Sequence, residues 1–189
     1  MKPNALLLSL TMIAGVASAA PQLADEYIGF SGAFAHHNVS YANYNSNEDN
    51  RVGYALTAGY YVLPQLSLEL AFADLGESKG KDLNGKVSTS IRSVSFSALG
   101  HLPVTEQFGV YGRLGAGQLR ARGDYGFGSY TTHDYQPVVG IGVEGTISNE
   151  WRLFAELTHY GKVTLENQNG DSMGNVKAMA LQAGASYHF

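Results

Sequence analysis

Apolar and polar residues alternate with a period of two over much of the chain. In residues 66–73 one face carries only leucine and phenylalanine, while the other carries serine, glutamate and alanine. The same alternation recurs in four later segments: 108–117, 138–145, 151–160 and 179–189. This period indicates β-strands with two unlike faces. No later window holds 18 uninterrupted apolar residues, so the sequence predicts no membrane-spanning helix.

The pattern predicts eight strands, near residues 27–35, 51–62, 66–76, 87–101, 107–119, 134–146, 151–162 and 176–189. Three connectors are short turns, at 63–65, 102–106 and 147–150. The other four are long and rich in Asn, Gly, Asp and Ser, at 36–50, 77–86, 120–133 and 163–175. Short and long connectors therefore alternate, as periplasmic turns and outer loops do in an outer-membrane barrel.

The balance of charged and apolar residues decides which side of the sheet faces outward. Only 15% of the 189 residues are charged, against about 25% in an average chain, and this is too few to coat a soluble β-sandwich. An apolar exterior in lipid around a narrow lumen of small and polar residues fits better. Backbone groups in hydrocarbon must all be paired, so the sheet must close. The sequence thus predicts an all-β fold, an eight-stranded antiparallel up-and-down transmembrane β-barrel with short periplasmic turns and long outer loops.

Composition also excludes several functions. The net charge of -4 lacks the basic surplus of a nucleic-acid binder, so no nucleic-acid partner is expected. Without cysteine, a disulfide scaffold and a Cys-ligated zinc site are both excluded. Four histidines expected near the outer mouth match no metal-ligand spacing, so neither a metal site nor a cofactor is predicted: His36, His37, His133 and His159.

The N-terminus has the pattern of a secretory signal peptide. Lys2 precedes a short apolar run at 5–16, and Ala17-Ser18-Ala19 gives the small residues read by signal peptidase. The predicted division is a signal peptide at 1–19 and one outer-membrane β-barrel domain at 20–189. An N-terminal anchor helix is the alternative. With the signal removed, the expected location is the cell outer membrane.

The C-terminus carries a short pattern that resembles the β-signal read by the outer-membrane assembly machinery. A polar residue is followed by glycine two positions later, and then by an aromatic residue and a terminal aromatic: Gln182, Gly184, Tyr187 and Phe189. The assembly machinery is therefore an expected partner. Outer-membrane lipid and lipopolysaccharide are the others that the barrel itself implies.

Three stretches resemble the small outer-membrane β-barrel proteins, namely the transmembrane domain of outer-membrane protein A and the OmpX/Ail group. They lie at 59–69, 110–115 and 184–189. The resemblance implies an inward glutamate at Glu69 in a lumenal salt-bridge network. It also implies inward basic residues on the fourth and seventh strands, where this chain has Ala98 and Phe154.

Four charged residues are expected to point into the lumen: Glu69, Arg113, Glu144 and Glu156. An eight-stranded barrel is just wide enough for side chains to fill it. Buried charges there must pair, and Arg113 on the fifth strand is expected to meet Glu144 and Glu156. The group is either a plug that holds the barrel or an ion pathway.

The long outer loops hold the candidates for surface binding: Tyr41, Tyr44, Arg122, Gly123 and Asp124. The last three form an Arg-Gly-Asp triplet, which host adhesion receptors read and which also occurs by chance. The predicted function is a structural or surface-interaction role in adhesion or the envelope, with a host or surface ligand bound by the loops. A narrow porin-like ion channel is the alternative.

Enzyme activity is not predicted. Some eight-stranded barrels modify lipid A, and their deacylase uses a His-x-Ser pair on a late strand. The nearest match here is His159-Tyr160-Gly161, where glycine stands in the place of the nucleophile.

Overall fold

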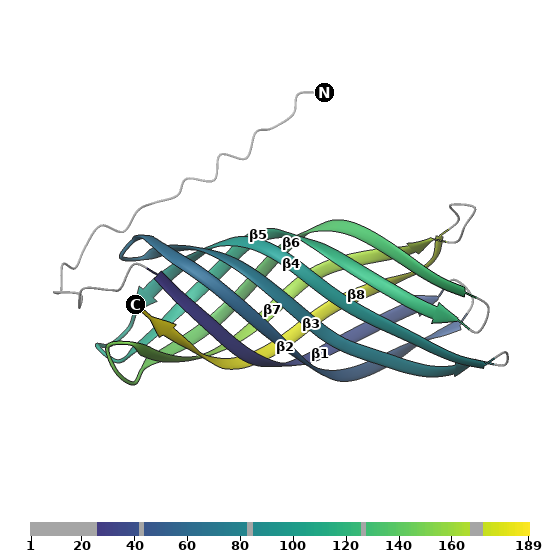
Figure 1. Cartoon of the computed structure of the whole chain (residues 1–189), viewed down its shortest axis with the longest axis horizontal. Helices are drawn as coiled ribbons and strands as arrows, with labels where there is room; N and C mark the ends of the chain where they lie inside the picture. Colours follow the sequence, from purple (N-terminus) through teal and green to yellow (C-terminus); the bar gives the residue numbers. More distant parts are fainter. Residues whose placement is uncertain (1–25, 42–43, 83–84, 126–127, 167–171) are drawn as a thin grey trace, which may run out of the picture.

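The protein forms a closed barrel of eight antiparallel strands, in which each strand pairs with its neighbours in sequence and β1 pairs with β8 (Figure 1). The strands are β1 (Glu26–Tyr41), β2 (Tyr44–Leu63), β3 (Leu66–Asp82), β4 (Gly85–Pro103), β5 (Phe108–Tyr125), β6 (Gly128–Thr146), β7 (Trp151–Glu166) and β8 (Ser172–His188). The predicted fold class is confirmed.

The computed structural model describes residues 26–41, 44–82, 85–125, 128–166 and 172–189, with side chains for all of these except 37–50, 78–89, 123–130 and 163–176. The expected signal peptide at 1–19 lies outside the described residues. Within them, no helix is long and apolar enough to cross a membrane.

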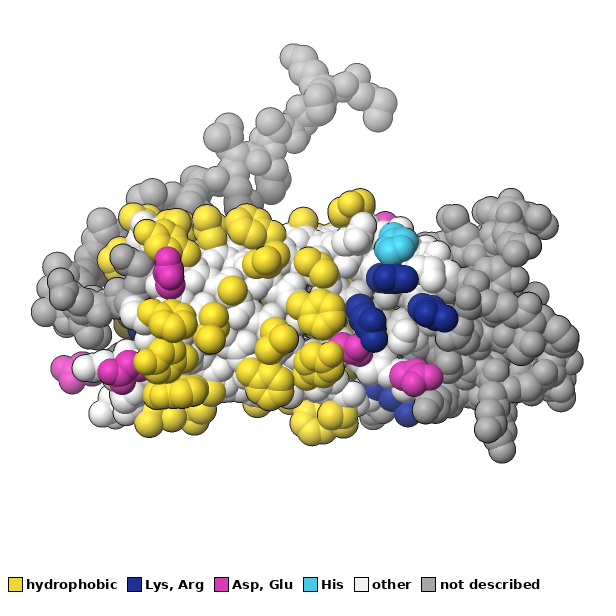
Figure 2. Space-filling model, viewed as in Figure 1, with side chains coloured by type: hydrophobic (Ala, Val, Ile, Leu, Met, Phe, Trp, Pro, Cys, Tyr) yellow, Lys and Arg dark blue, Asp and Glu magenta, His cyan; other side chains and the backbone are white. Residues whose placement is uncertain are grey.

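Alternating side chains separate the outside of the barrel from its lumen. On β3, Leu70 is 55% exposed, whereas its neighbour Glu69 is 4% exposed. Large apolar side chains stand outward all around the wall, among them Phe30, Leu56, Phe96, Leu114, Ile141 and Leu181. Figure 2 shows hydrophobic side chains as a broad band on one face of the barrel, bordered on one side by Lys and Arg side chains. The closed ladder pairs the backbone groups inside this band, as lipid requires.

The strands on the outer side are longer than predicted. Asp82 pairs with Gly85, and Tyr125 pairs with Gly128, so the ladder continues through most of the residues expected in loops. Backbone groups make this ladder, and a sequence rich in Asn, Gly and Ser can therefore extend it once the partner strand is in register. Beyond the lipid, neither face of a hairpin needs to be apolar. The Arg-Gly-Asp triplet accordingly lies on β5 and not in a loop.

The lumen changes character along its length. Its periplasmic half is mostly polar, as predicted, but it holds large side chains beside the predicted small ones, and its outer half is closed by an apolar layer. The largest members are Leu75, Ile91, Leu119 and Val138, each at most 1% exposed, and Tyr160 and several alanines complete the layer. Their outward neighbours Asp74, Arg92 and Arg120 are polar. At this level the barrel therefore has an apolar interior and a polar exterior, like a soluble barrel.

Two tyrosines fill the periplasmic half of the lumen by lying over glycines. Tyr27 on β1 is directly opposite Gly59, and Tyr111 on β5 is directly opposite Gly142. A Cβ atom built on either glycine would collide with the facing ring. The narrow lumen can hold these large side chains because the opposite positions have none.

This packing predicts a different cost for two Gly→Ala substitutions. Gly59→Ala forces Tyr27 from its place and should lower the free energy of unfolding by about 1–3 kcal/mol, the usual cost of overpacking. Gly112→Ala is the control, because nothing lies within 4 Å of the added methyl group. Urea unfolding in lipid vesicles would measure both. Equal stability of the two variants would contradict the packing argument.

Candidate functional site: the lumenal polar network

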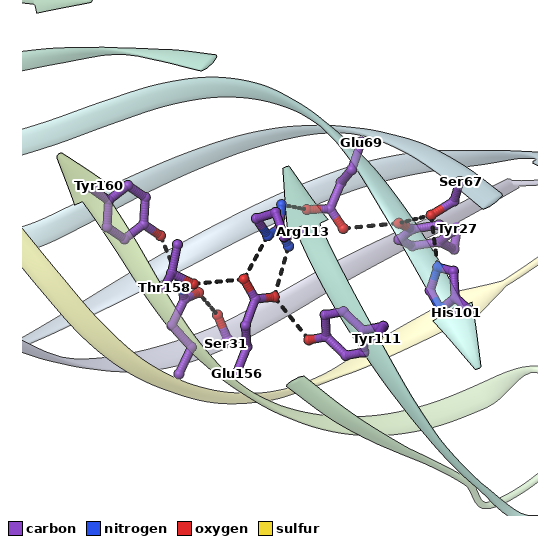
Figure 3. Close-up of polar contacts among 11 residues, drawn as sticks. Tyr27, Ser31, Ser67, Glu69, His101, Tyr111, Arg113, Glu156, Thr158 and Tyr160 are labelled. Carbon is purple, nitrogen blue, oxygen red and sulfur yellow. Dashed lines mark hydrogen bonds and ion pairs between the residues drawn. The ribbon is translucent and has the colours of Figure 1, made fainter. Parts of the chain in front are cut away.

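A three-residue ionic cluster crosses the lumen on the periplasmic side of the apolar layer. Arg113 on β5 places its Nη1 2.6 Å from Oε1 of Glu69 on β3. Its Nε and Nη2 donate to the two carboxylate oxygens of Glu156 on β7, at 2.6 and 2.9 Å. The side chains are 8%, 4% and 2% exposed. One guanidinium thus bridges two carboxylates that come from strands on either side of β5 (Figure 3).

Neighbouring hydroxyl groups complete this cluster. Tyr27 donates to Oε2 of Glu69 at 2.9 Å. Tyr111 donates to Oε2 of Glu156 at 2.9 Å, and Thr158 donates to Oε1 at 2.6 Å. Every carboxylate oxygen of the cluster therefore accepts at least one hydrogen bond. Charges can remain in a buried site when their hydrogen-bonding atoms all have partners in this way.

Gln182 on β8 extends the cluster toward the outer end. Its Nε2 donates to the Tyr160 hydroxyl at 2.6 Å and to Thr158 at 3.2 Å. Its Oε1 accepts from Ser31 at 3.0 Å. Because Tyr160 belongs to the apolar layer, the hydrogen-bond network passes directly into that layer.

A second polar group lies nearer the periplasmic end. His101 on β4 bridges Ser67 and Glu144, at 2.9 Å from Nε2 and 3.0 Å from Nδ1. Arg152 on β7 donates to the Tyr61 hydroxyl at 3.0 Å and lies 3.7 Å from Glu144.

This arrangement corrects the expected pairing of Arg113 with Glu144. Arg113 is opposite Gly140 on β6, so Glu144 lies four residues closer to the periplasm. At about 3.3 Å per residue, the two side chains start roughly 13 Å apart along the strand. Glu144 pairs with His101 and Arg152 instead. Glu69 supplies the second carboxylate of Arg113.

Sequence reasoning missed several members of the two groups: Tyr27, Tyr61, His101, Tyr111 and Arg152. Each lies on the inward face by alternation, and that signal could have identified them. The inward positions implied by resemblance also differ. Phe154 does line the lumenal cavity, but Ala98 pairs with the lipid-facing Leu114, so its side chain lies on the outer face.

Ser67, His101 and Glu144 form a line of hydroxyl, imidazole and carboxylate such as hydrolases use to activate a nucleophile. Because a carboxylate accepts hydrogen bonds, the imidazole Nδ1 donates to Glu144 and its Nε2 faces the serine. The Ser67 side chain is 0% exposed, however, and the Tyr27 hydroxyl lies 3.3 Å from it. A substrate carbonyl has no room to approach in this packing. These three side chains therefore stabilise the packing of the periplasmic part of the lumen.

A small cavity separates the two polar groups. Its volume is about 30 Å³, and its lining includes Tyr61, Arg113, Glu144, Arg152 and His188. This is room for roughly two water molecules. Among the described residues, no group of three or more histidine or acidic side chains is arranged to hold a metal ion.

The remaining candidate residues lie away from the lumenal groups. Tyr41 pairs with Tyr44 at the outer end of β1 and β2. Arg122, Gly123 and Asp124 continue β5 beyond the lipid-facing band, opposite Thr131, Tyr130 and Ser129.

The C-terminal pattern lies at the seam that closes the barrel. Gly184 approaches the backbone of β1 so closely that a Cβ would meet the Phe30 carbonyl. The backbone N–H of Phe189 donates to the Glu26 carbonyl at 3.0 Å. Tyr187 packs edge-on against Trp151 and Phe189, with ring centroids 5.2 Å apart in both pairs. Of the four pattern residues, Gln182 alone also takes part in the lumenal hydrogen bonds given above.

The central cluster predicts a large cost for removing its cation. Arg113→Met leaves two buried carboxylates facing each other, and the free energy of unfolding should fall by about 3–5 kcal/mol. Arg92→Met is the control, because the Arg92 side chain is 58% exposed and its ion pair with Asp74, at the surface of the barrel, is worth about 1 kcal/mol or less. Denaturant unfolding in a neutral detergent would measure both.

An uncharged variant of the cluster tests whether the unpaired charge or the lost packing causes the loss of stability. The triple variant E69Q, R113M, E156Q keeps acceptors for Tyr27 and Tyr111 but carries no charge, so it should regain most of the stability lost in R113M. A triple variant as unstable as R113M would show that the packing of the guanidinium, and not the unpaired charge, is what matters.

The whole chain matches known outer-membrane proteins. A family model described as "Outer membrane protein beta-barrel domain" matches residues 5–189. Outer membrane protein A of Shigella flexneri is 29% identical over 200 residues, and that of Klebsiella aerogenes is 28% identical over 207 residues. Both alignments cover all of this chain but 56% of the relative, so the chain spans about half the length of the curated relatives that it matches.

Solved barrels have the same fold at low sequence identity. Neisserial surface protein A superposes with a TM-score of 0.65 and 17% identity, covering 87% of this chain and 97% of that one. Ail of Yersinia pestis, in complex with the heparin analogue sucrose octasulfate, superposes with a TM-score of 0.56 and 20% identity, covering 87% and 99%. With its closed eight-stranded wall and its match over residues 5–189, the chain belongs to the outer-membrane protein β-barrel family and is a protein of the outer membrane.

Proposed function

We propose that the protein is a closed barrel with a structural or surface-interaction role, in adhesion or in the envelope, carried by its outer hairpins. The observation that carries this proposal is the filled lumen. The Arg113 cluster crosses the periplasmic half, and the layer around Leu75, Ile91 and Leu119 fills the outer half. A barrel with a filled lumen can serve as an anchor, and the surface that it offers to a ligand then lies outside the membrane.

The outer hairpins are well suited to such a role. β4 continues from its last large lipid-facing residues, Phe96 and Val94, through nine more residues to Gly85. Ladder pairing holds these extensions in a fixed geometry, and a fixed surface loses less conformational entropy on binding than a loose loop does. The name of one solved neighbour, the attachment invasion locus protein, and its complex with a heparin analogue describe that protein. They support the same kind of role here.

Two further partners belong to this proposal. The closing strand carries the pattern that we assign to recognition by the outer-membrane assembly machinery: Gln182, Gly184, Tyr187 and Phe189. Lipid and lipopolysaccharide surround the wall. Removal of a signal peptide at 1–19 would precede both contacts.

Shortening one hairpin tests the role of the outer surface. Residues 39–47, which include Tyr41 and Tyr44, would be replaced by Asn-Gly between the paired residues Asn38 and Glu48. The variant should still insert and should keep the heat-dependent shift in gel mobility of a folded barrel, because the lipid-facing wall is intact. Adherence of expressing cells to epithelial monolayers should fall to that of cells without the protein.

A matched variant replaces residues 123–130 between the paired residues Arg122 and Thr131, and so removes the Gly-Asp of the triplet. It shows whether binding depends on one hairpin or on several. Unchanged adherence in both variants, with insertion preserved, would reject a surface role for these hairpins.

A narrow ion channel is the second candidate, favoured by the polar cavity between the two charged groups. The filled outer half opposes it, because an apolar constriction excludes water and ions. Planar-bilayer recordings of the wild-type protein should therefore stay silent across voltage, and Leu119→Ser with Ile91→Ser should raise conductance by wetting the layer. Steady conductance in the wild-type protein would favour the channel over the closed anchor.

A further inference from the structure

Three basic residues and a histidine lie side by side on the outside of the wall. The register places Arg92 on β4 opposite Arg120 on β5, and Arg120 opposite His133 on β6. Arg122 follows two residues later on β5, on the same face. All four side chains are exposed.

This row lies at the edge of the lipid-facing band. On β4, Val94 and Phe96 are 50% and 58% exposed, and Arg92 is the next outward residue. On β6, Tyr135 is 77% exposed and His133 is next. Outward residues are about 7 Å apart along a strand, so the guanidinium groups lie at the level of lipid headgroups. Figure 2 shows Lys and Arg side chains gathered just beyond the hydrophobic ones, with a histidine and acidic side chains beside them.

Charges of the same sign directly opposite each other destabilise a sheet unless a counter-ion is present. Arg92 has a partner in Asp74, at 3.0 Å from Nε to Oδ2. Glu77 lies in line with Arg122, because both pair with Ser90, and neither Glu77 nor Arg122 is without a partner. Within the described residues, no carboxylate forms an ion pair with Arg120, which lies between Arg92 and His133. The row therefore lacks an anion at its centre.

The two edges of the band carry opposite charge. Every exposed lysine or arginine whose side chain is described lies at the outer edge: Arg92, Arg120, Arg122, Lys162 and Lys177. Of the exposed glutamates whose side chains are described, three lie at the periplasmic end, Glu26, Glu106 and Glu150, and one, Glu77, lies at the outer edge. The outer leaflet of this membrane is built of phosphorylated glycolipid, so its anions meet the basic edge.

We propose that Arg92, Arg120 and Arg122 form a binding site for a phosphate group of the outer-leaflet glycolipid. Guanidinium groups present paired donors that match phosphate oxygens bidentately. Two opposite arginines on neighbouring strands can hold one phosphate between them, with Arg122 beside it. Tyr135 lies next to the row, where an aromatic ring suits the interface. The site does not depend on what the outer hairpins bind.

Native mass spectrometry of the purified protein in a non-ionic detergent, titrated with bisphosphorylated lipid A, tests the site. The double variant R92Q/R120Q should bind lipid A roughly tenfold more weakly or worse, as expected for the loss of charge-assisted hydrogen bonds. The control K162Q/K177Q removes the same charge from the same edge, on β7 and β8, and should change binding by less than about twofold. Heat-dependent gel mobility confirms that both variants are folded.

Lipid A from which both phosphates have been removed supplies the third arm. It should bind the wild-type protein as weakly as R92Q/R120Q binds the phosphorylated form. Equal losses in the two double variants would mean a diffuse attraction to a basic edge, and would overturn the site. Undiminished binding in R92Q/R120Q, or tight binding of the dephosphorylated lipid, would overturn it as well.

Discussion

Closure of an eight-stranded sheet is the constraint on which the rest of this structure depends. Hydrocarbon supplies no hydrogen bonds, so the wall must pair all its backbone groups, and the closed ladder from β1 to β8 does so. Eight strands leave an interior only as wide as side chains can fill. Charges in that interior are then buried and must find partners. The Arg113 cluster, with an acceptor role for every carboxylate oxygen, follows from the narrowness of the barrel as much as from any function.

The inner and outer faces of the wall exchange their polar and apolar residues along the barrel axis. In the membrane, Leu70 faces lipid and Glu69 faces the lumen. A few residues further along β3, Asp74 faces outward and Leu75 is fully buried. Both arrangements obey the same rule, that apolar side chains leave water, but the surroundings differ. Outside the bilayer the apolar residues have only the lumen in which to bury themselves, and the lumen is closed there as a consequence.

Alternation predicted the wall well, because the direction of a side chain in a strand depends only on its position in that strand. It predicts that Glu69, Arg113, Glu144 and Glu156 point inward, and in the structure these four side chains are at most 17% exposed. It could not identify their partners, because partners depend on register and tilt across several strands. The sequence therefore predicts Glu144 as a partner of Arg113, whereas His101 and Arg152 lie nearer to Glu144 in the structure. Leu75 and Leu119 lie at the ends of predicted strands and Arg122 lies in a predicted loop, because the alternation expected of lipid-facing strands no longer applies where the barrel leaves the membrane.

Two glycine bulges mark that same boundary. The register shifts between Asp74 and Glu77 on β3, and between His159 and Lys162 on β7. Each shift contains a glycine with positive φ, Gly76 at 85° and Gly161 at 89°, a conformation that other residues rarely adopt. A bulge adds a residue to one strand and increases its local twist. Past each bulge the pairing of β3 with β4 and of β7 with β8 continues, whereas the described pairing of β2 with β3 ends at Tyr54 and Asp74, and that of β6 with β7 ends at Val139 and His159. The two glycines therefore lie where the closed wall of the membrane section gives way to outer hairpins that keep their own pairing.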